Sequence, residues 1–174
     1  DMAGLTIRTQ DSQLMMDMVE VFGAEAVSLP ANLLYDALQI GDINGAENNL
    51  IWYMDQRLNE YAPVVTLSEH NVSPEILILS EQVRQTLSEE QLIAVQEAAD
   101  ESSQYQRELW VAQEVMARVE LENKDVTFID LTPEEKQQWV DAVEPLRGAE
   151  AEGYQDWMDK IEALRPDYAE GDAQ

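Results

Sequence analysis

Residues 1–30 read DMAGLTIRTQ DSQLMMDMVE VFGAEAVSLP, and this stretch decides the fold class. Residues 5–8 form a short run that ends in Arg8 and is typical of a β-strand. Apolar residues then recur at helical spacing from Leu14 to Phe22 and stop before Gly23, a residue suited to the position just after a helix. Residues 25–29 predict a second strand. The order strand, helix, strand indicates an α/β fold with parallel strands.

The same alternation continues outward to about Ser80. We expect a helix over residues 32–39, a short extended run before Asn48, a helix over 50–61, and apolar runs at 63–67 and 75–79. This pattern predicts an open, mostly parallel sheet with helices on its faces. Ligands of such sheets usually bind beyond the carboxyl ends of the strands. Residues 1–80 are therefore the region in which to look for a site.

A long helix is predicted to follow. Ser88 and Gln91 have the spacing of a capping box, and apolar or small residues recur at helical spacing to about Asn123. A helix of about 36 residues spans ~54 Å, which exceeds the ~30 Å of a small domain. Small residues such as Ala99 and Ala112 are poor coiled-coil knobs. We therefore expect a second lobe, rather than a coiled-coil partner, to cover this helix.

The remaining residues predict one strand and two helices. Residues 126–129 look like a returning strand, and Thr132, Pro133 and Glu135 mark another helix start. Helices through Trp139 and Trp157 are expected to separate near residue 148. These elements complete a helical region over residues 81–165, and the acidic tail at 166–174 is expected to be flexible.

Composition excludes several classes of protein. The 36 acidic residues against 10 Lys and Arg give a formal charge of -26, which excludes phosphate-neutralising nucleic-acid binding. The acids are dispersed, so they indicate a solvated surface, with or without adaptation to a saline habitat. No apolar stretch reaches the ~18 residues of a membrane span, so we expect a chain that is not membrane-embedded. The absence of cysteine removes disulfides and thiol chemistry.

Arg8 is the first candidate binding residue. It is the only Lys or Arg in the first 56 residues, which hold nine Asp and Glu, and it lies at a predicted strand end. A guanidinium offers a planar fork of donors that matches a carboxylate, so an organic anion is a suitable ligand. The alternative is a plain surface ion pair with an acid such as Asp11.

Two further candidates follow in the chain. Asn48 lies in GDINGAENN, residues 41–49, where glycines permit close backbone approach and an amide can both donate and accept; an ordinary turn is the alternative. His70, the sole histidine, follows the apolar run that ends at Leu67. A Ser-His-Asp triad is not excluded by counting, but no glycine-rich phosphate loop or nucleophile elbow supports an enzyme. We expect no cofactor and no metal site.

The chain resembles the C-terminal portion of solute-binding proteins of tripartite ATP-independent periplasmic (TRAP) transporters. DMAGLTIR is similar to the family's Asp-Leu-x-Gly-Leu-x-Ile-Arg, and FGAEAVSLP follows in order. YDALQIGDINGAEN is similar to Tyr-x-Ala-Leu-Gln-x-Gly-x-x-Asp-Gly-x-Glu-Asn. LSEEQLIAVQEAADESSQYQRE resembles the start of the family's long connecting helix. The ordered series, which runs to about residue 145, is more specific than any one motif.

The resemblance implies a hinge-closing periplasmic receptor that captures a small organic acid and delivers it to TRAP membrane permease subunits. Residues 1–80 would be its second ligand-binding lobe, with Arg8 binding the carboxylate, Asn48 contacting the ligand and His70 joining a polar network. Three positions depart from the family: Ala31 replaces a common aromatic residue, and Asn44 and Asn49 replace Asp and Pro. Ala31 leaves the identity of the ligand open.

The resemblance also implies that the first lobe is missing. A truncated chain would leave apolar helix surface uncovered, so self-association is a further expectation. Two rival functions remain: a ligand-sensing regulatory domain of related α/β architecture, and an enzyme with a carboxylate dyad, which would turn its ligand over instead of binding it stoichiometrically.

Overall fold

The computed structural model describes residues 2–164, which form two compact units. The first unit contains residues 2–34, 43–46 and 132–164, and the second contains 35–42 and 47–131. Each unit is assembled from segments far apart in the chain. The division of the sequence into residues 1–80 and 81–165 stays a prediction, and the predicted flexible tail at 166–174 lies outside the described residues.

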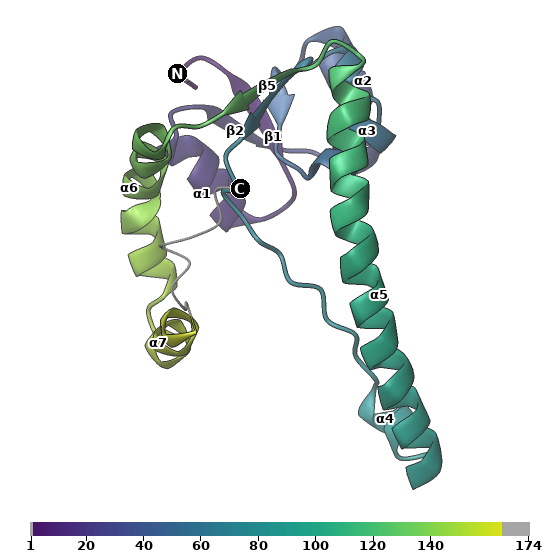
Figure 1. Ribbon diagram of the computed structural model, residues 1–174. Helices are drawn as coiled ribbons and strands as arrows, with labels where there is room; N and C mark the ends of the chain where they lie inside the picture. Colours follow the sequence, from purple (N-terminus) through teal and green to yellow (C-terminus); the bar gives the residue numbers. More distant parts are fainter. Residues whose placement is uncertain (1, 165–174) are drawn as a thin grey trace. The chain divides into compact units, whose positions relative to one another are not determined.

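A three-stranded parallel sheet organises the first unit (Figure 1). Its strands are β1 (Thr6–Thr9), β2 (Glu25–Ser28) and β3 (Gly45–Ala46), in the order β2-β1-β3. Helix α1 (Gln13–Val21) connects β1 to β2, as the spacing of its apolar residues predicts. Gly23 follows the helix with φ +92°, a conformation that costs glycine little. The α/β class and the parallel arrangement are confirmed.

The face of α1 that is turned to the sheet forms the core of the first unit. Met15, Met18 and Val19 are buried on this helix, together with Ala24 and Ile43. Helix α6 (Pro133–Glu150) contacts α1, and the rings of Phe22 and Trp139 lie 4.3 Å apart between centroids. Aromatic contact of this kind adds to the burial of apolar area.

The C-terminal helices break at a different place from the prediction. Helix α6 begins at the expected Thr132 capping box but passes through Gly148 and ends at Glu150. Gly153, with φ +87°, lies in the turn before α7 (Gln155–Ala163). A glycine within a helix costs only about 1 kcal/mol relative to alanine, so Gly148 alone does not end the helix. The predicted separation near residue 148 is therefore wrong by a few residues.

A pair of parallel strands and the long helix define the second unit (Figure 1). Strands β4 (Val64–Leu67) and β5 (Thr127–Asp130) pair in register, and helix α5 (Glu89–Glu122) runs between them in sequence. The Ser88 capping box begins α5, and its 34 residues agree with the predicted long helix. The short helices are α2 (Leu34–Ile40), α3 (Leu50–Asp55), η2 (Leu58–Glu60) and α4 (Glu81–Arg84). The 3-10 turn η1 (Ala31–Leu33), which precedes α2 in the chain, belongs to the first unit.

The helix predicted over residues 50–61 is interrupted. Arg57 adopts a left-handed conformation with φ 57°, so α3 ends and the separate turn η2 begins. The break buries Leu58 and places Glu60 where it accepts hydrogen bonds from Arg57 and from the hydroxyl of Tyr35. Burial of Leu58 and these bonds account for a bend that helical periodicity could not reveal.

The apolar run at residues 75–79 forms no strand in the structure. Residues 68–80 have no regular secondary structure, and Ile76, Leu77 and Ile78 are exposed. Among residues 2–164, no helix has both the length and the apolar composition that spanning a bilayer demands.

Candidate ligand-binding site

Arg8 is held at the carboxyl end of β1. Its residue exposure is 5%, and its Nε donates a hydrogen bond of 2.7 Å to the carbonyl oxygen of Leu29, the residue after β2. A buried charge is stable only when it is paired or hydrogen-bonded. The bond to Leu29 therefore fixes the plane of the guanidinium at the edge of the sheet where parallel α/β proteins bind ligands.

The alternative role for Arg8 was a surface ion pair with Asp11. Arg8 is buried whereas Asp11 is exposed, so Arg8 does not have the surroundings of a surface ion pair. Arg8 is the only Lys or Arg of the first 56 residues, and it lies inside the unit and not on its surface. This position favours a role in ligand binding.

Asn44 supports the strand that carries Arg8. Its backbone N–H donates to Thr6 O at 2.8 Å, and its Oδ1 accepts from Thr6 N at 2.8 Å. This reciprocal pair extends the pairing of β1 with the segment that leads into β3. Asn44 thus has a structural role at the opposite end of β1 from Arg8, although it lies in the motif that suggested a site.

Asn48 lies in the second unit, in the turn before α3. Its Oδ1 accepts from the backbone N–H of Asn49 at 2.8 Å and from Asn49 Nδ2 at 3.1 Å. Asn49 in turn caps α3, because its Oδ1 accepts from Trp52 N at 2.8 Å. A backbone N–H can only donate, so the atom of Asn48 that faces it must be the amide oxygen. The NH₂ group of exposed Asn48 is then the part that can serve a ligand.

His70 also lies in the second unit and has two polar neighbours. Ser68 Oγ lies 2.7 Å from His70 Nδ1, and Glu47 Oε2 lies 3.7 Å from His70 Nε2. All three side chains are partly buried. Glu47 precedes Asn48 in the chain, so these contacts connect the end of β4 to the turn that carries Asn48.

The sequence-predicted residues are therefore divided between the units. Arg8 belongs to the first, whereas Asn48 and His70 belong to the second. Sequence reasoning missed Glu47 and Ser68. Ser68 stands two residues from His70 at a strand end, so a search for polar neighbours of the single histidine could have found it. Glu47 adjoins Asn48 but lies 23 positions from His70, so no sequence signal connects it to the histidine.

A hollow of about 150 Å³ in the first unit differs from the end of β1 in the residues that line it. Its lining is apolar or uncharged: Met2, Val21, Phe22, Gln138, Trp139 and Ala142. It contains no cation that could pair with a carboxylate, so the end of β1 is the better anion site.

A parallel sheet with a buried arginine at its carboxyl edge defines a candidate anion-binding α/β protein. Comparison with known families makes this specific: residues 1–152 match the model of the bacterial extracellular solute-binding proteins, family 7. The chain belongs to this family, whose members are solute-binding proteins and not enzymes.

Individual relatives agree with this assignment. A solute-binding protein of Chromohalobacter salexigens is 34% identical over 110 residues, which are 63% of this chain and 33% of the relative. A TRAP periplasmic solute-binding protein of Pseudomonas putida, solved with bound D-glucuronate, is 29% identical with a TM-score of 0.87. One from Xanthobacter autotrophicus, solved with bound β-D-galacturonate, is 35% identical with a TM-score of 0.78.

These relatives are longer than the chain. The Pseudomonas comparison covers 96% of this chain but 54% of that protein, and the Xanthobacter comparison covers 86% and 49%. The chain therefore spans about half the length of these solved relatives.

Proposed function

We propose that this chain contributes the carboxylate-binding part of a TRAP solute receptor that captures a small organic acid in the periplasm and delivers it to the membrane permease. The observation that carries the proposal is the buried guanidinium of Arg8, oriented by Leu29 at the carboxyl edge of a parallel sheet. A carboxylate would pair with its fork of donors, and Asn48 would donate from its NH₂ group.

Uronic acids are the ligand class we propose to test first. The solved relatives from Pseudomonas putida and Xanthobacter autotrophicus contain bound D-glucuronate and β-D-galacturonate, respectively. A uronate combines one carboxylate for Arg8 with several hydroxyl oxygens that can accept from Asn48. Exclusion of water around the ion pair as the receptor closes would strengthen it.

Isothermal titration calorimetry of the full-length protein tests the proposal. D-glucuronate and D-galacturonate should bind, whereas D-glucose and D-galactose, which lack the carboxylate, should not. Arg8→Ala should lower the affinity by about 100-fold or more, because a charge-assisted bidentate contact is lost. Arg147→Ala removes an equal charge from an exposed pair with Glu144 in the same unit and should leave the affinity unchanged. Equal losses in both variants would reject the role of Arg8.

The ionic-strength dependence gives a second test. The net charge of -26 repels an anionic ligand at long range, and salt screens this repulsion. The association rate of a uronate should therefore rise with salt, while a close ion pair at Arg8 is screened much less. Stopped-flow measurements that show a rate falling with salt would indicate attraction and contradict this mechanism.

A further inference from the structure

The cluster of Ser68, His70 and Glu47 sits between the end of β4 and the turn before α3. His70 is the only histidine of the chain, and each of its ring nitrogens faces a different partner. Ser68 Oγ is at hydrogen-bond distance from Nδ1, 2.7 Å, whereas Glu47 Oε2 is 3.7 Å from Nε2, which is too long for a direct hydrogen bond.

These contacts favour one tautomer of a neutral imidazole. An ionised carboxylate can only accept hydrogen bonds. A neutral ring without a proton on Nε2 would direct the lone pair of that nitrogen at the carboxylate oxygen of Glu47, and the two would repel each other. The ring that carries its proton on Nε2 instead directs a positive N–H dipole at the carboxylate. Nδ1 is then the acceptor, and the Ser68 hydroxyl must donate to it.

In the turn beside this cluster, the orientation of the Asn48 side-chain amide is fixed. The backbone N–H of Asn49 holds the amide oxygen of Asn48, so the NH₂ group remains for an outside acceptor. Glu47 immediately precedes Asn48, and its side chain is oriented towards His70. Restraining Glu47 from β4 therefore restrains the turn that presents Asn48.

We propose that Ser68 and Glu47 are positioning residues that hold His70 in the Nε2–H tautomer and thereby keep the NH₂ group of Asn48 presented to the ligand. The turn then offers hydrogen-bond donors, so it takes carboxylate or hydroxyl oxygens and rejects a ligand that places an ammonium group there. The ligand part rests on the proposed function, whereas the tautomer part does not.

Nitrogen-15 NMR of the imidazole tests the tautomer directly, because a single histidine gives one set of signals. At a pH where the ring is neutral, the wild type should be in the Nε2–H form. Ser68→Ala and Glu47→Gln should each yield a mixture of tautomers, and Ser68→Thr, which keeps the hydroxyl, should restore the wild-type signals. Ser73→Ala and Glu75→Gln make the same changes in the adjoining exposed segment and should have no effect. A wild-type ring in the Nδ1–H form would overturn the proposal.

Calorimetry of the full-length protein with D-glucuronate tests the consequence for the ligand. Ser68→Ala should weaken binding by roughly three- to tenfold, the size of a lost hydrogen bond, and Ser68→Thr should recover most of it. Asn48→Asp should weaken binding by about tenfold or more, because it replaces a donor with a charged acceptor. Wild-type binding with no loss in Ser68→Ala would reject the positioning role and leave the proposed function intact. If the wild type binds no uronate, the proposed uronate ligand is rejected, and the NMR result still decides the roles of Ser68 and Glu47.

Discussion

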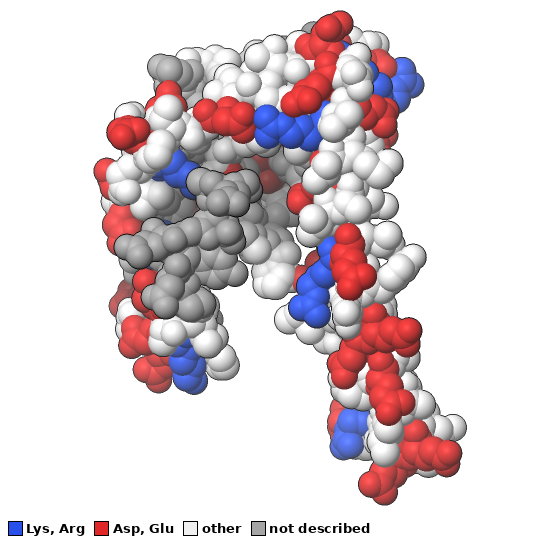
Figure 2. Space-filling model, in the orientation of Figure 1, with Lys and Arg blue, Asp and Glu red and all other residues white. Residues whose placement is uncertain are grey.

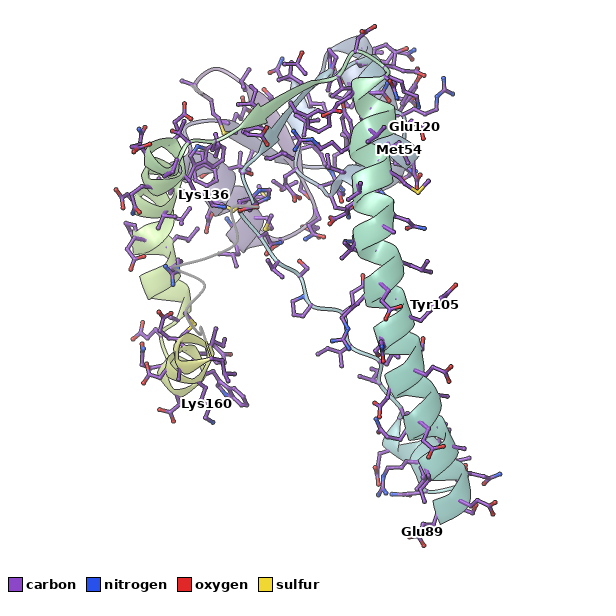
Figure 3. The ribbon with its side chains drawn as sticks, in the orientation of Figure 1. Met54, Glu89, Tyr105, Glu120, Lys136 and Lys160 are labelled. Carbon is purple, nitrogen blue, oxygen red and sulfur yellow. The ribbon has the colours of Figure 1, made fainter. Side chains whose placement is uncertain are left out.

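The two ends of α5 share one helix but have opposite surroundings. Near its C-terminal end, Ala117 and Leu121 are completely buried, and α3 packs against the helix. Across residues 93–113, nearly every side chain is exposed, including Tyr105, which projects from the helix at 63% exposure (Figure 3). The same helical periodicity runs through both parts. Periodicity therefore reveals which face of a helix is apolar, but not whether anything covers it.

The two ends of α5 also differ in their charged side chains. Acidic side chains gather towards the end at which α5 begins, where Glu89, Glu90 and Glu97 are exposed (Figure 2). Near the other end, Arg118 binds Glu122 and Asp130, with N–O distances of 3.1 Å. Its guanidinium also lies 4.9 Å from the centre of the Phe128 ring.

The largest expected difference between the two ends comes from one substitution made at both. Leu121→Ala should lower the free energy of unfolding by about 3 kcal/mol, because it leaves a cavity at a side chain with no exposed area. Leu109→Ala removes the same atoms from a residue that is 41% exposed and should cost less than about 1 kcal/mol. Urea unfolding measures both values, and equal losses would mean that the exposed part is covered in solution.

Alkaline pH should destabilise the packed region around α3. The hydroxyl of Tyr53 donates to Ala62 O at 2.7 Å, and burial raises the pKa of Tyr53 from 10.0 to about 12. The folded state thus favours the neutral phenol, and this stabilisation is complete below pH 10 and is lost as the pH rises to about 12. The free energy of unfolding, measured between pH 10 and about 12, should fall as the pH rises. In Tyr53→Phe this fall should be shallower. An unchanged slope in that variant would contradict the assignment.

A smaller loss is expected at the ion pairs of the packed end. Arg118→Ala should cost about 1 kcal/mol, because the side chain is 38% exposed and solvent screens its contacts. Added salt should reduce this cost. Arg84→Ala breaks only a neighbouring pair with Glu81 at a side chain that is 54% exposed, and its effect should be smaller than that of Arg118→Ala. A larger cost for Arg84→Ala than for Arg118→Ala in thermal unfolding would reverse the comparison.

A substitution in the exposed part of α5 should affect self-association of the chain and not its stability. Tyr105→Lys should change the free energy of unfolding by less than about 0.5 kcal/mol, because the side chain lies in solvent. If residues 1–174 self-associate through this apolar surface, the same substitution should lower the mass measured by light scattering. Added salt should raise the mass of the wild type, because it screens the net charge of -26. A wild-type monomer at all salt concentrations would exclude self-association.

Local elements were largely predictable because their signals are local. The capping boxes at Ser88 and Thr132 appear as predicted, with both reciprocal hydrogen bonds formed. The break at Arg57 was not predictable, since it depends on the burial of Leu58 and on a hydrogen bond that Glu60 accepts from Tyr35, 25 positions away. Long-range partners of this kind leave no periodic trace in a sequence.

The candidate site was predictable in part for the same reason. Arg8 stood out as a lone cation at a strand end, and the motif series identified Asn48 and His70 as candidates. Their roles as ligand contacts stay predictions. The contact of Glu47 with His70 joins residues 23 positions apart, so no spacing rule would have paired them.

By itself, the sequence determined the α/β class, the parallel strands, the long helix and the resemblance to the solute-binding family, because periodicity, capping residues and ordered motifs are written in consecutive residues. Only the tertiary structure decided that Arg8 is buried against Leu29, that Asn48 presents its NH₂ group, and that one end of α5 is packed and the other exposed. Burial and hydrogen-bond polarity depend on which distant segments meet, and that information exists only once the chain has folded.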